Sequence, residues 1–60
     1  MSYFEIYKGS TEWYWRLVSA NGRIVADGSE GYSSKENAVR AANRVRKMLQ
    51  TVTVRPHRRS

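Results

Sequence analysis

The dipeptide Asn21-Gly22 constrains the fold of this chain more than any other feature. It lies between two apolar-rich runs, where an Asn-Gly pair is the strongest short-range signal for a β-hairpin with a two-residue turn, because both turn residues must adopt positive φ. The strand pairing then follows by counting outward from the turn. It places Ala20 opposite Arg23, Val18 opposite Val25, Leu17 opposite Ala26, and Arg16 opposite Asp27.

A second hairpin is predicted on the N-terminal side. Residues 3–8 alternate between polar and apolar side chains, as a strand does, and residues 9–12 have the composition of a turn. A four-residue loop there places Ile6 opposite Trp15 and Phe4 opposite Leu17, so both hairpins assign Trp15 and Leu17 to one face. The predicted inner face holds Phe4, Ile6, Trp13, Trp15, Leu17, Ile24 and Ala26.

A helix is predicted to cover this inner face. Ser33 followed by Glu36 fits a capping box, although Ser34 fits the N-cap equally well. The segment from Ser34 to Leu49 would span about 24 Å at about 1.5 Å per residue, enough to cross three strands. Its apolar residues form one stripe on a helical wheel, consisting of Ala38, Ala41, Ala42, Val45, Met48 and Leu49.

The C-terminal tail alternates again. Thr51 to Arg55 includes the β-branched Val52 and Val54 and ends at Pro56, which predicts a short edge strand, paired within the chain or across a homodimer. Residues 56–60 are predicted to form a basic, disordered tail. The fold class is therefore α+β: one domain over residues 1–55, with a three-stranded antiparallel meander under one C-terminal amphipathic helix and a short tail strand.

The size of the chain favours self-association. A 60-residue domain buries only about 60% of the surface that its unfolded form exposes, and without cysteine it has no disulfide to compensate. No signal peptide or membrane span is expected, which predicts a cytoplasmic protein.

Apolar side chains are predicted outside the core, and we expect them to form a dimer surface: Tyr3, Val18 and Val25 in one cross-strand row, Val39 off the helical stripe, and Val52 and Val54 in the tail.

The order of these segments resembles the YegP-like family of small uncharacterised proteins. The resemblance runs from about Tyr3 to Lys47 and rests on Phe4-Glu5-Ile6-Tyr7-Lys8, Trp13-Tyr14-Trp15-Arg16-Leu17, Asn21-Gly22, Ile24-Val25-Ala26, Gly31-Tyr32, Ser34-Lys35, Ala38 and Val45. It implies three antiparallel strands under one helix, present as tandem repeats or as single repeats that form homodimers. It supplies no catalytic or binding residue. Members of the family are commonly acidic or near neutral, whereas this chain has Arg44-Val45-Arg46-Lys47 and an arginine-rich end.

The net charge of +6 is concentrated in the second half of the chain. All five acidic residues lie within the first 36 residues, and residues 37–60 contain seven basic residues and no acid. Arg40, Arg44 and Lys47 are spaced to form one helical stripe, which suits either a solvated helix face or a nonspecific nucleic-acid surface. The candidate nucleic-acid surface consists of Arg40, Arg44, Arg46, Lys47, Arg55, Arg58 and Arg59.

Catalysis is not expected. The single histidine, His57, lies in the predicted tail, and Glu5 and Asp27 are separated by Arg16 in the pairing, which argues against a carboxyl group of raised pKa. The sequence has neither metal-ligand spacing nor a phosphate-cradling loop, so no cofactor is predicted. We therefore expect a small dimeric interaction module without enzymatic activity, with nonspecific nucleic-acid binding as the alternative.

Overall fold

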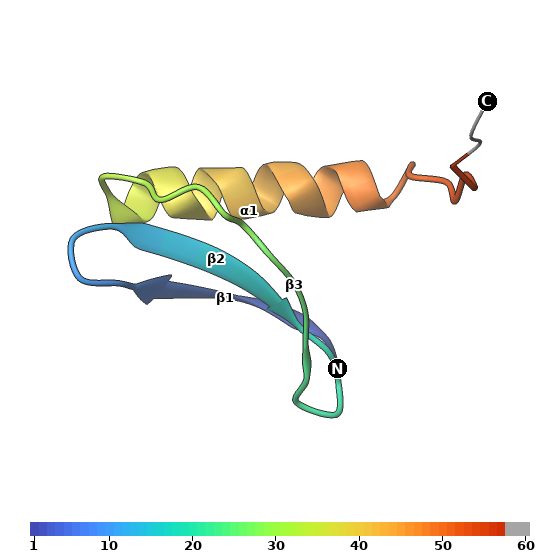
Figure 1. The fold of residues 1–60 in the computed structure, drawn as a ribbon, viewed down its shortest axis with the longest axis horizontal. Helices are drawn as coiled ribbons and strands as arrows, with labels where there is room; N and C mark the ends of the chain where they lie inside the picture. Colours follow the sequence, from blue (N-terminus) through green and yellow to red (C-terminus); the bar gives the residue numbers. More distant parts are fainter. Residues whose placement is uncertain (58–60) are drawn as a thin grey trace.

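The computed structural model describes residues 1–57 and contains a three-stranded antiparallel sheet and one helix. The strands are β1 (Tyr3–Lys8), β2 (Trp13–Val18) and β3 (Ile24–Asp27), and they lie in the order β1-β2-β3. The helix, α1 (Lys35–Leu49), lies across one face of the sheet and packs on β2 and β1 (Figure 1). The predicted α+β meander under one helix is confirmed.

The β1–β2 hairpin has the predicted register. Lys8 lies opposite Trp13, Ile6 opposite Trp15, and Phe4 opposite Leu17. The loop between them is closed by the backbone amide of Gly9, which donates to the carbonyl of Glu12 at 2.7 Å. The Phe4 and Trp15 rings are in contact on the inner face, with centroids 5.6 Å apart. The count from a four-residue loop was therefore correct.

The β2–β3 hairpin differs from its prediction. Its loop has three residues, because the Ser19 amide donates to the carbonyl of Arg23 at 2.8 Å and the Gly22 amide donates to the carbonyl of Ser19 at 2.9 Å. Within residues 1–57 only Gly22 has positive φ, at 85°, so the predicted two-residue turn, in which Asn21 would also have positive φ, is wrong. The Asn21 side chain instead accepts a hydrogen bond from the Arg23 amide at 3.3 Å.

The three-residue loop is accompanied by a β-bulge, that is, by one unpaired residue in β3. Regular pairing on both sides of a three-residue loop places Val18 opposite Ile24, and the register then shifts between Leu17 and Val18. Val25 is the additional residue of β3, and beyond it the predicted pairs of Leu17 with Ala26 and Arg16 with Asp27 are restored. The prediction was therefore correct beyond the bulge and wrong nearer the turn.

The bulge changes which residues share a face of the sheet. Directly opposed residues lie on the same face, so Ile24 lies on the face of Val18, opposite the helix, and not on the predicted inner face. Ile24 is 55% exposed. Val18 was expected to lie outside the core, but its side chain is buried and only 5% exposed.

The core beneath α1 is small. The buried residues of the helix are Ala38, Ala41 and Ala42, and within residues 1–57 no large side chain is completely enclosed. The apolar side chains of the inner face of β1 and β2 are only half-buried; they are Phe4, Ile6, Trp13, Trp15 and Leu17. The single chain therefore leaves much of its largest apolar surface in contact with solvent.

Ser34, and not Ser33, is the N-cap of α1, which begins at Lys35. The Ser34 hydroxyl accepts a hydrogen bond from the Asn37 amide at 3.2 Å, which is the geometry of an N-cap. After Leu49 the chain runs outward from the sheet, and residues 52–57 form no strand (Figure 1). The tail strand predicted for Thr51–Arg55 is therefore not formed in the single chain, because no strand edge lies beside it. α1 is the only helix within residues 1–57, and it lacks the length and apolarity that crossing a membrane requires.

Candidate functional site

The face of the sheet opposite the helix carries a row of alternating charge. Arg16 lies between Glu5 and Asp27 across the three strands, as predicted. Its Nε atom donates to Glu5 Oε1 at 2.7 Å, and this bond raises the pKa of Arg16 above its usual value. The guanidinium group also lies 4.5 Å from the centroid of the Tyr7 ring. Arg16 is therefore engaged by its own sheet and is a poor candidate for binding an external phosphate.

Next to this row, two tyrosines form a stacked pair. The rings of Tyr7 and Tyr14 are directly opposed, with centroids 5.6 Å apart and planes inclined by 21°. The Tyr14 hydroxyl donates to Glu12 Oε1 at 3.4 Å. Partial desolvation raises the pKa of Tyr14, and the negative charge of Glu12 adds to the rise. A phenol in this state remains protonated at neutral pH.

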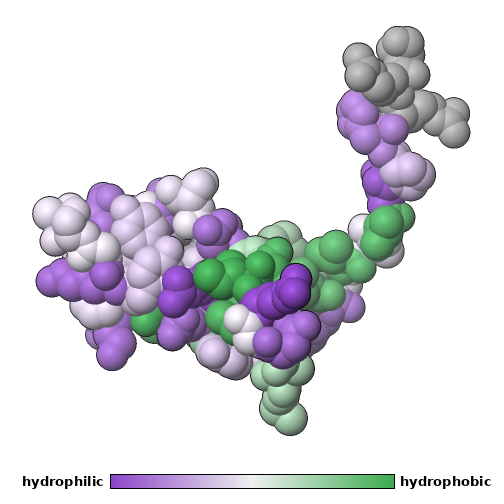
Figure 2. All heavy atoms as spheres, turned by 60° about the horizontal axis from the view of Figure 1, so that its bottom comes forward, coloured by the Kyte–Doolittle hydropathy of each residue, from purple (hydrophilic) through white to green (hydrophobic). Residues whose placement is uncertain are grey.

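Of the three strand residues predicted to form the dimer surface, two are exposed and one is buried. Tyr3 is 52% exposed and Val25 is 58% exposed, whereas Val18 lies buried between their strands. Ile24, which was assigned to the core, joins this patch because of the bulge. Figure 2 shows that hydrophobic side chains gather in one area of this side of the molecule and again along the tail.

A groove runs between the free edge of β1 and the helix. It has a volume of about 480 Å³, and its apolar lining comes from Phe4, Ile6, Leu17, Val39 and Ala42. Tyr3, at the start of β1, also lines the groove, which connects it to the exposed patch. One feature of the sequence pointed to this groove: Val39 lies off the apolar stripe of the helix. That feature alone does not indicate where on the molecule the groove lies.

In the tail, the two predicted interface valines are exposed. Val52 is 54% exposed and Val54 is 97% exposed. Both lie in the segment that runs away from the sheet. They therefore lie apart from the patch formed by Tyr3, Ile24 and Val25 within one copy of the chain.

The structure separates the predicted basic residues into different places. Arg40, Arg44 and Lys47 line one shallow hollow together with Asn43, and all four are exposed. Arg46 instead lines the groove beside β1. Arg55 lies in the tail, and Arg58 and Arg59 lie outside the described residues. Only the first three therefore form the common surface that was predicted.

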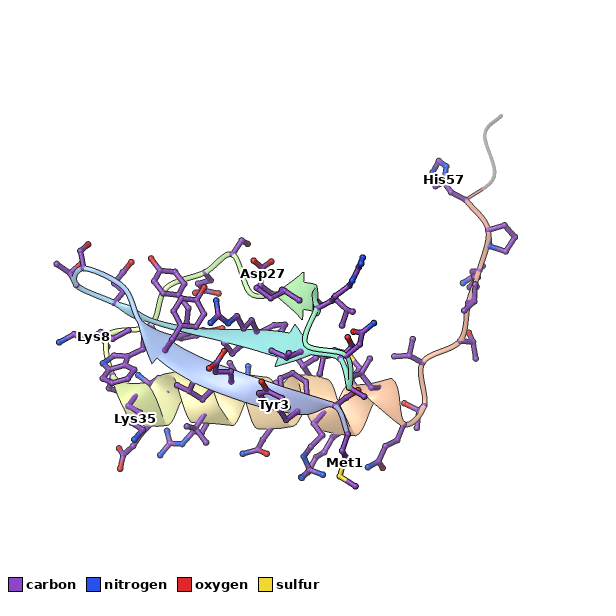
Figure 3. The ribbon with its side chains drawn as sticks, turned by 90° about the horizontal axis from the view of Figure 1, so that it is seen from below. Met1, Tyr3, Lys8, Asp27, Lys35 and His57 are labelled. Atoms are coloured by element: carbon purple, nitrogen blue, oxygen red, sulfur yellow. The ribbon has the colours of Figure 1, made fainter. Side chains whose placement is uncertain are left out.

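The residues with catalytic potential are dispersed. His57 lies in the tail, far from Asp27 and from Lys35 at the start of the helix (Figure 3). Within residues 1–57 there is no group of three histidine, cysteine or carboxylate side chains that could hold a metal ion. Glu30 and Asp27 line a separate hollow with Trp15 and Arg44. The surface is distinguished instead by its exposed apolar residues and by the exposed cations Arg40, Arg44 and Lys47 of α1.

The comparisons with known proteins agree with the sequence resemblance. DUF1508, described as a domain of unknown function, matches residues 10–55. UPF0339 proteins of Neisseria meningitidis serogroup B and of serogroup A are each 52% identical to this chain over 42 residues, covering 68% of this chain and 73% of the relative. The solution NMR structure of a protein from Haloferax volcanii is 33% identical and has a TM-score of 0.78, covering 93% of this chain and 95% of that chain. This chain therefore belongs to the DUF1508 family, the family of UPF0339 and YegP-like proteins, which has no assigned function.

Proposed function

We propose that this chain is a small, self-associating interaction module in which two copies exchange their tails. The observation that carries the proposal is the tail itself: Val54 is 97% exposed in a segment of alternating β-branched residues that has no strand partner. Such residues favour a pleated, half-buried strand over an isolated extended segment. The family match extends to residue 55, so this segment belongs to the domain.

The edge of β1 is the proposed acceptor for the tail of a second copy. β1 lies at the edge of the sheet, and an edge strand presents unpaired backbone amides and carbonyls to an incoming strand. Val52 and Val54 would share one face of an extended tail, because side chains two residues apart point the same way. The apolar groove between β1 and the helix offers that face a place to pack.

A reciprocal exchange would also use the exposed patch. Stable interfaces bury about 1,200–2,000 Å² in total, which is more than two valines can supply. Tyr3 lines the groove and also lies in one cross-strand row with Val18 and the exposed Ile24, so it links the groove to the patch. In a two-fold dimer each surface is used twice, which doubles the apolar area removed from water.

The proposed role is binding without a chemical step. Glu5 is held by Arg16, and His57 lies in the tail, so the side chains most suited to proton transfer do not converge. The half-buried tryptophans of the inner face have the environment of an incomplete core, which a second copy would complete.

Sedimentation equilibrium of matched variants tests the proposal. We expect the wild type to be dimeric at micromolar concentration and Val54→Asp to be monomeric, because the carboxylate would have to enter the apolar groove. The control is Thr53→Asp, which adds the same charge one residue earlier and on the opposite face of the extended tail. A wild type that sediments as a monomer, or equal effects of both variants, would contradict the exchange.

A further inference from the structure

We infer that the exposed face of α1 formed by Arg40, Arg44 and Lys47 binds the phosphate backbone of duplex nucleic acid without sequence preference. These three residues and Asn43 line a single hollow of about 300 Å³ on the solvent side of the helix. We call this surface the basic helix face. The inference goes beyond self-association and does not depend on it.

The cations of this face are not neutralised by the protein itself. Within residues 1–57, the single salt bridge joins Arg16 to Glu5 on the opposite side of the sheet. Glu36 is the one acidic residue of the helix and lies near Arg40 in a neighbouring hollow, while Asp27 and Glu30 share another hollow with Arg44. These carboxylates lie beside the basic helix face but form no ion pair with it. Its positive charge is therefore available to an external anion.

The spacing of the cations suits a linear array of phosphates. Residues at i, i+4 and i+7 lie along one side of a helix, and at about 1.5 Å per residue the three side chains extend over about 10 Å. Two of the three are arginines, whose planar guanidinium groups donate paired hydrogen bonds to phosphate oxygens. Asn43 adds a neutral donor between them.

A duplex is favoured over a single strand because the basic helix face contains no aromatic residue. Proteins that bind single strands combine cations with aromatic side chains on which the bases stack. In this chain Trp13 and Trp15 lie under the helix, and Tyr7 and Tyr14 stack on each other on the adjacent strands β1 and β2. The helix therefore offers contacts to the backbone and none to the bases.

Fluorescence anisotropy with a labelled duplex of mixed sequence tests this inference. Three phosphate contacts predict that the logarithm of the association constant falls with the logarithm of salt concentration at a slope of about −2.7, a loss of about 40-fold in affinity between about 50 and 200 mM salt. A duplex of scrambled sequence should bind equally well. The unlabelled single strand should compete less effectively than the duplex.

Charge-matched double variants identify the surface. Arg40→Gln with Arg44→Gln should reduce the magnitude of the slope by about 1.8, whereas Lys8→Gln with Arg23→Gln removes the same charge elsewhere and should leave the slope nearly unchanged. Arg40→Lys with Arg44→Lys keeps the charge and should retain most of the slope. Because all of these positions are exposed, circular dichroism should show the same thermal transition for every variant.

The inference is overturned by any of four results. These are no binding to the duplex at about 50 mM salt, equal effects of the two double variants, tighter binding of the single strand, or binding to vesicles of anionic lipid without binding to the duplex.

Discussion

At the residue scale, two glycines allow aromatic rings to approach the backbone. A Cβ atom at Gly28 would lie 2.5 Å from Trp15 Nε1, and one at Gly9 would lie 2.8 Å from the Tyr14 ring. The Gly28 amide also donates to the carbonyl of Trp15 at 3.0 Å, so the ring and the backbone are held together at the end of β3. Glycine is required at these two positions because a side chain would clash with the rings, and not because of the backbone conformation: Gly22 is the only described glycine with positive φ.

Gly28→Ala should destabilise the domain by about 1–3 kcal/mol, because the added methyl group displaces the Trp15 indole from its contact with Phe4. Urea unfolding followed by tryptophan fluorescence measures both the change in stability and the altered environment of the ring. Ser29→Ala, at the next and exposed position, is the control. Equal stability of wild type and Gly28→Ala would show that the ring is not packed against this backbone.

The pH dependence of stability should contain a contribution from Tyr14. Its pKa is raised in the folded chain above the ordinary 10.0, mainly by desolvation. As the pH rises above 10, the unfolded chain therefore loses this proton more readily than the folded chain, and the free energy of unfolding falls. Tyr14→Phe should make this alkaline decline shallower and leave stability between pH 6 and 8 without a new pH dependence, as measured by denaturation at a series of pH values.

At the element scale, the first hairpin and the helix could be predicted because independent patterns agreed. The inner positions of Phe4, Trp15 and Leu17 follow from strand alternation together with the length of the residue 9–12 loop. The predicted inner position of Ile24 was wrong, because an Asn-Gly pair suits both a two-residue turn and the last two positions of a three-residue loop. The alternation of apolar residues does not distinguish these two loops, since the bulge at Val25 restores the same register beyond it.

The beginning of α1 provides a prediction for this scale. Ser34→Ala should lower the stability of the domain by about 1 kcal/mol, because the Asn37 amide loses its hydrogen-bond acceptor. Ser33→Ala should have a smaller effect, since Ser34 and not Ser33 supplies that acceptor. Thermal unfolding of the two variants measured by circular dichroism compares them directly. A larger loss for Ser33→Ala would support the alternative capping box with Glu36.

At the scale of the whole molecule, the candidate surfaces were less predictable than the fold. The stripe of Arg40, Arg44 and Lys47 followed from helical spacing, and the structure brings these residues together. The groove beside β1 depends on how the helix lies across two strands, and residue spacing alone does not determine that angle. The burial of Val18 likewise depends on its neighbours in three dimensions.

If two copies complete each other's cores, the melting temperature should depend on protein concentration. Dissociation accompanies unfolding of such a dimer, so roughly hundredfold dilution should lower the transition temperature by several degrees. Val54→Asp should melt at a lower temperature that does not change on dilution. Differential scanning fluorimetry over a concentration series measures both. A wild-type transition that is independent of concentration would indicate that the small core beneath α1 is sufficient by itself.

The bulge at Val25 also makes the chain tolerant of a change in length. Eight residues lie between the paired Leu17 and Ala26. Three of them form the loop, four form the pairs of Val18 with Ile24 and of Ser19 with Arg23, and Val25 is left unpaired. A chain that lacks this one residue would have an uninterrupted ladder with the same loop and the same partners for Arg16 and Leu17. Shortening by one codon at this position should therefore preserve the hairpin, and relatives that differ there by a single gap would still align across both strands.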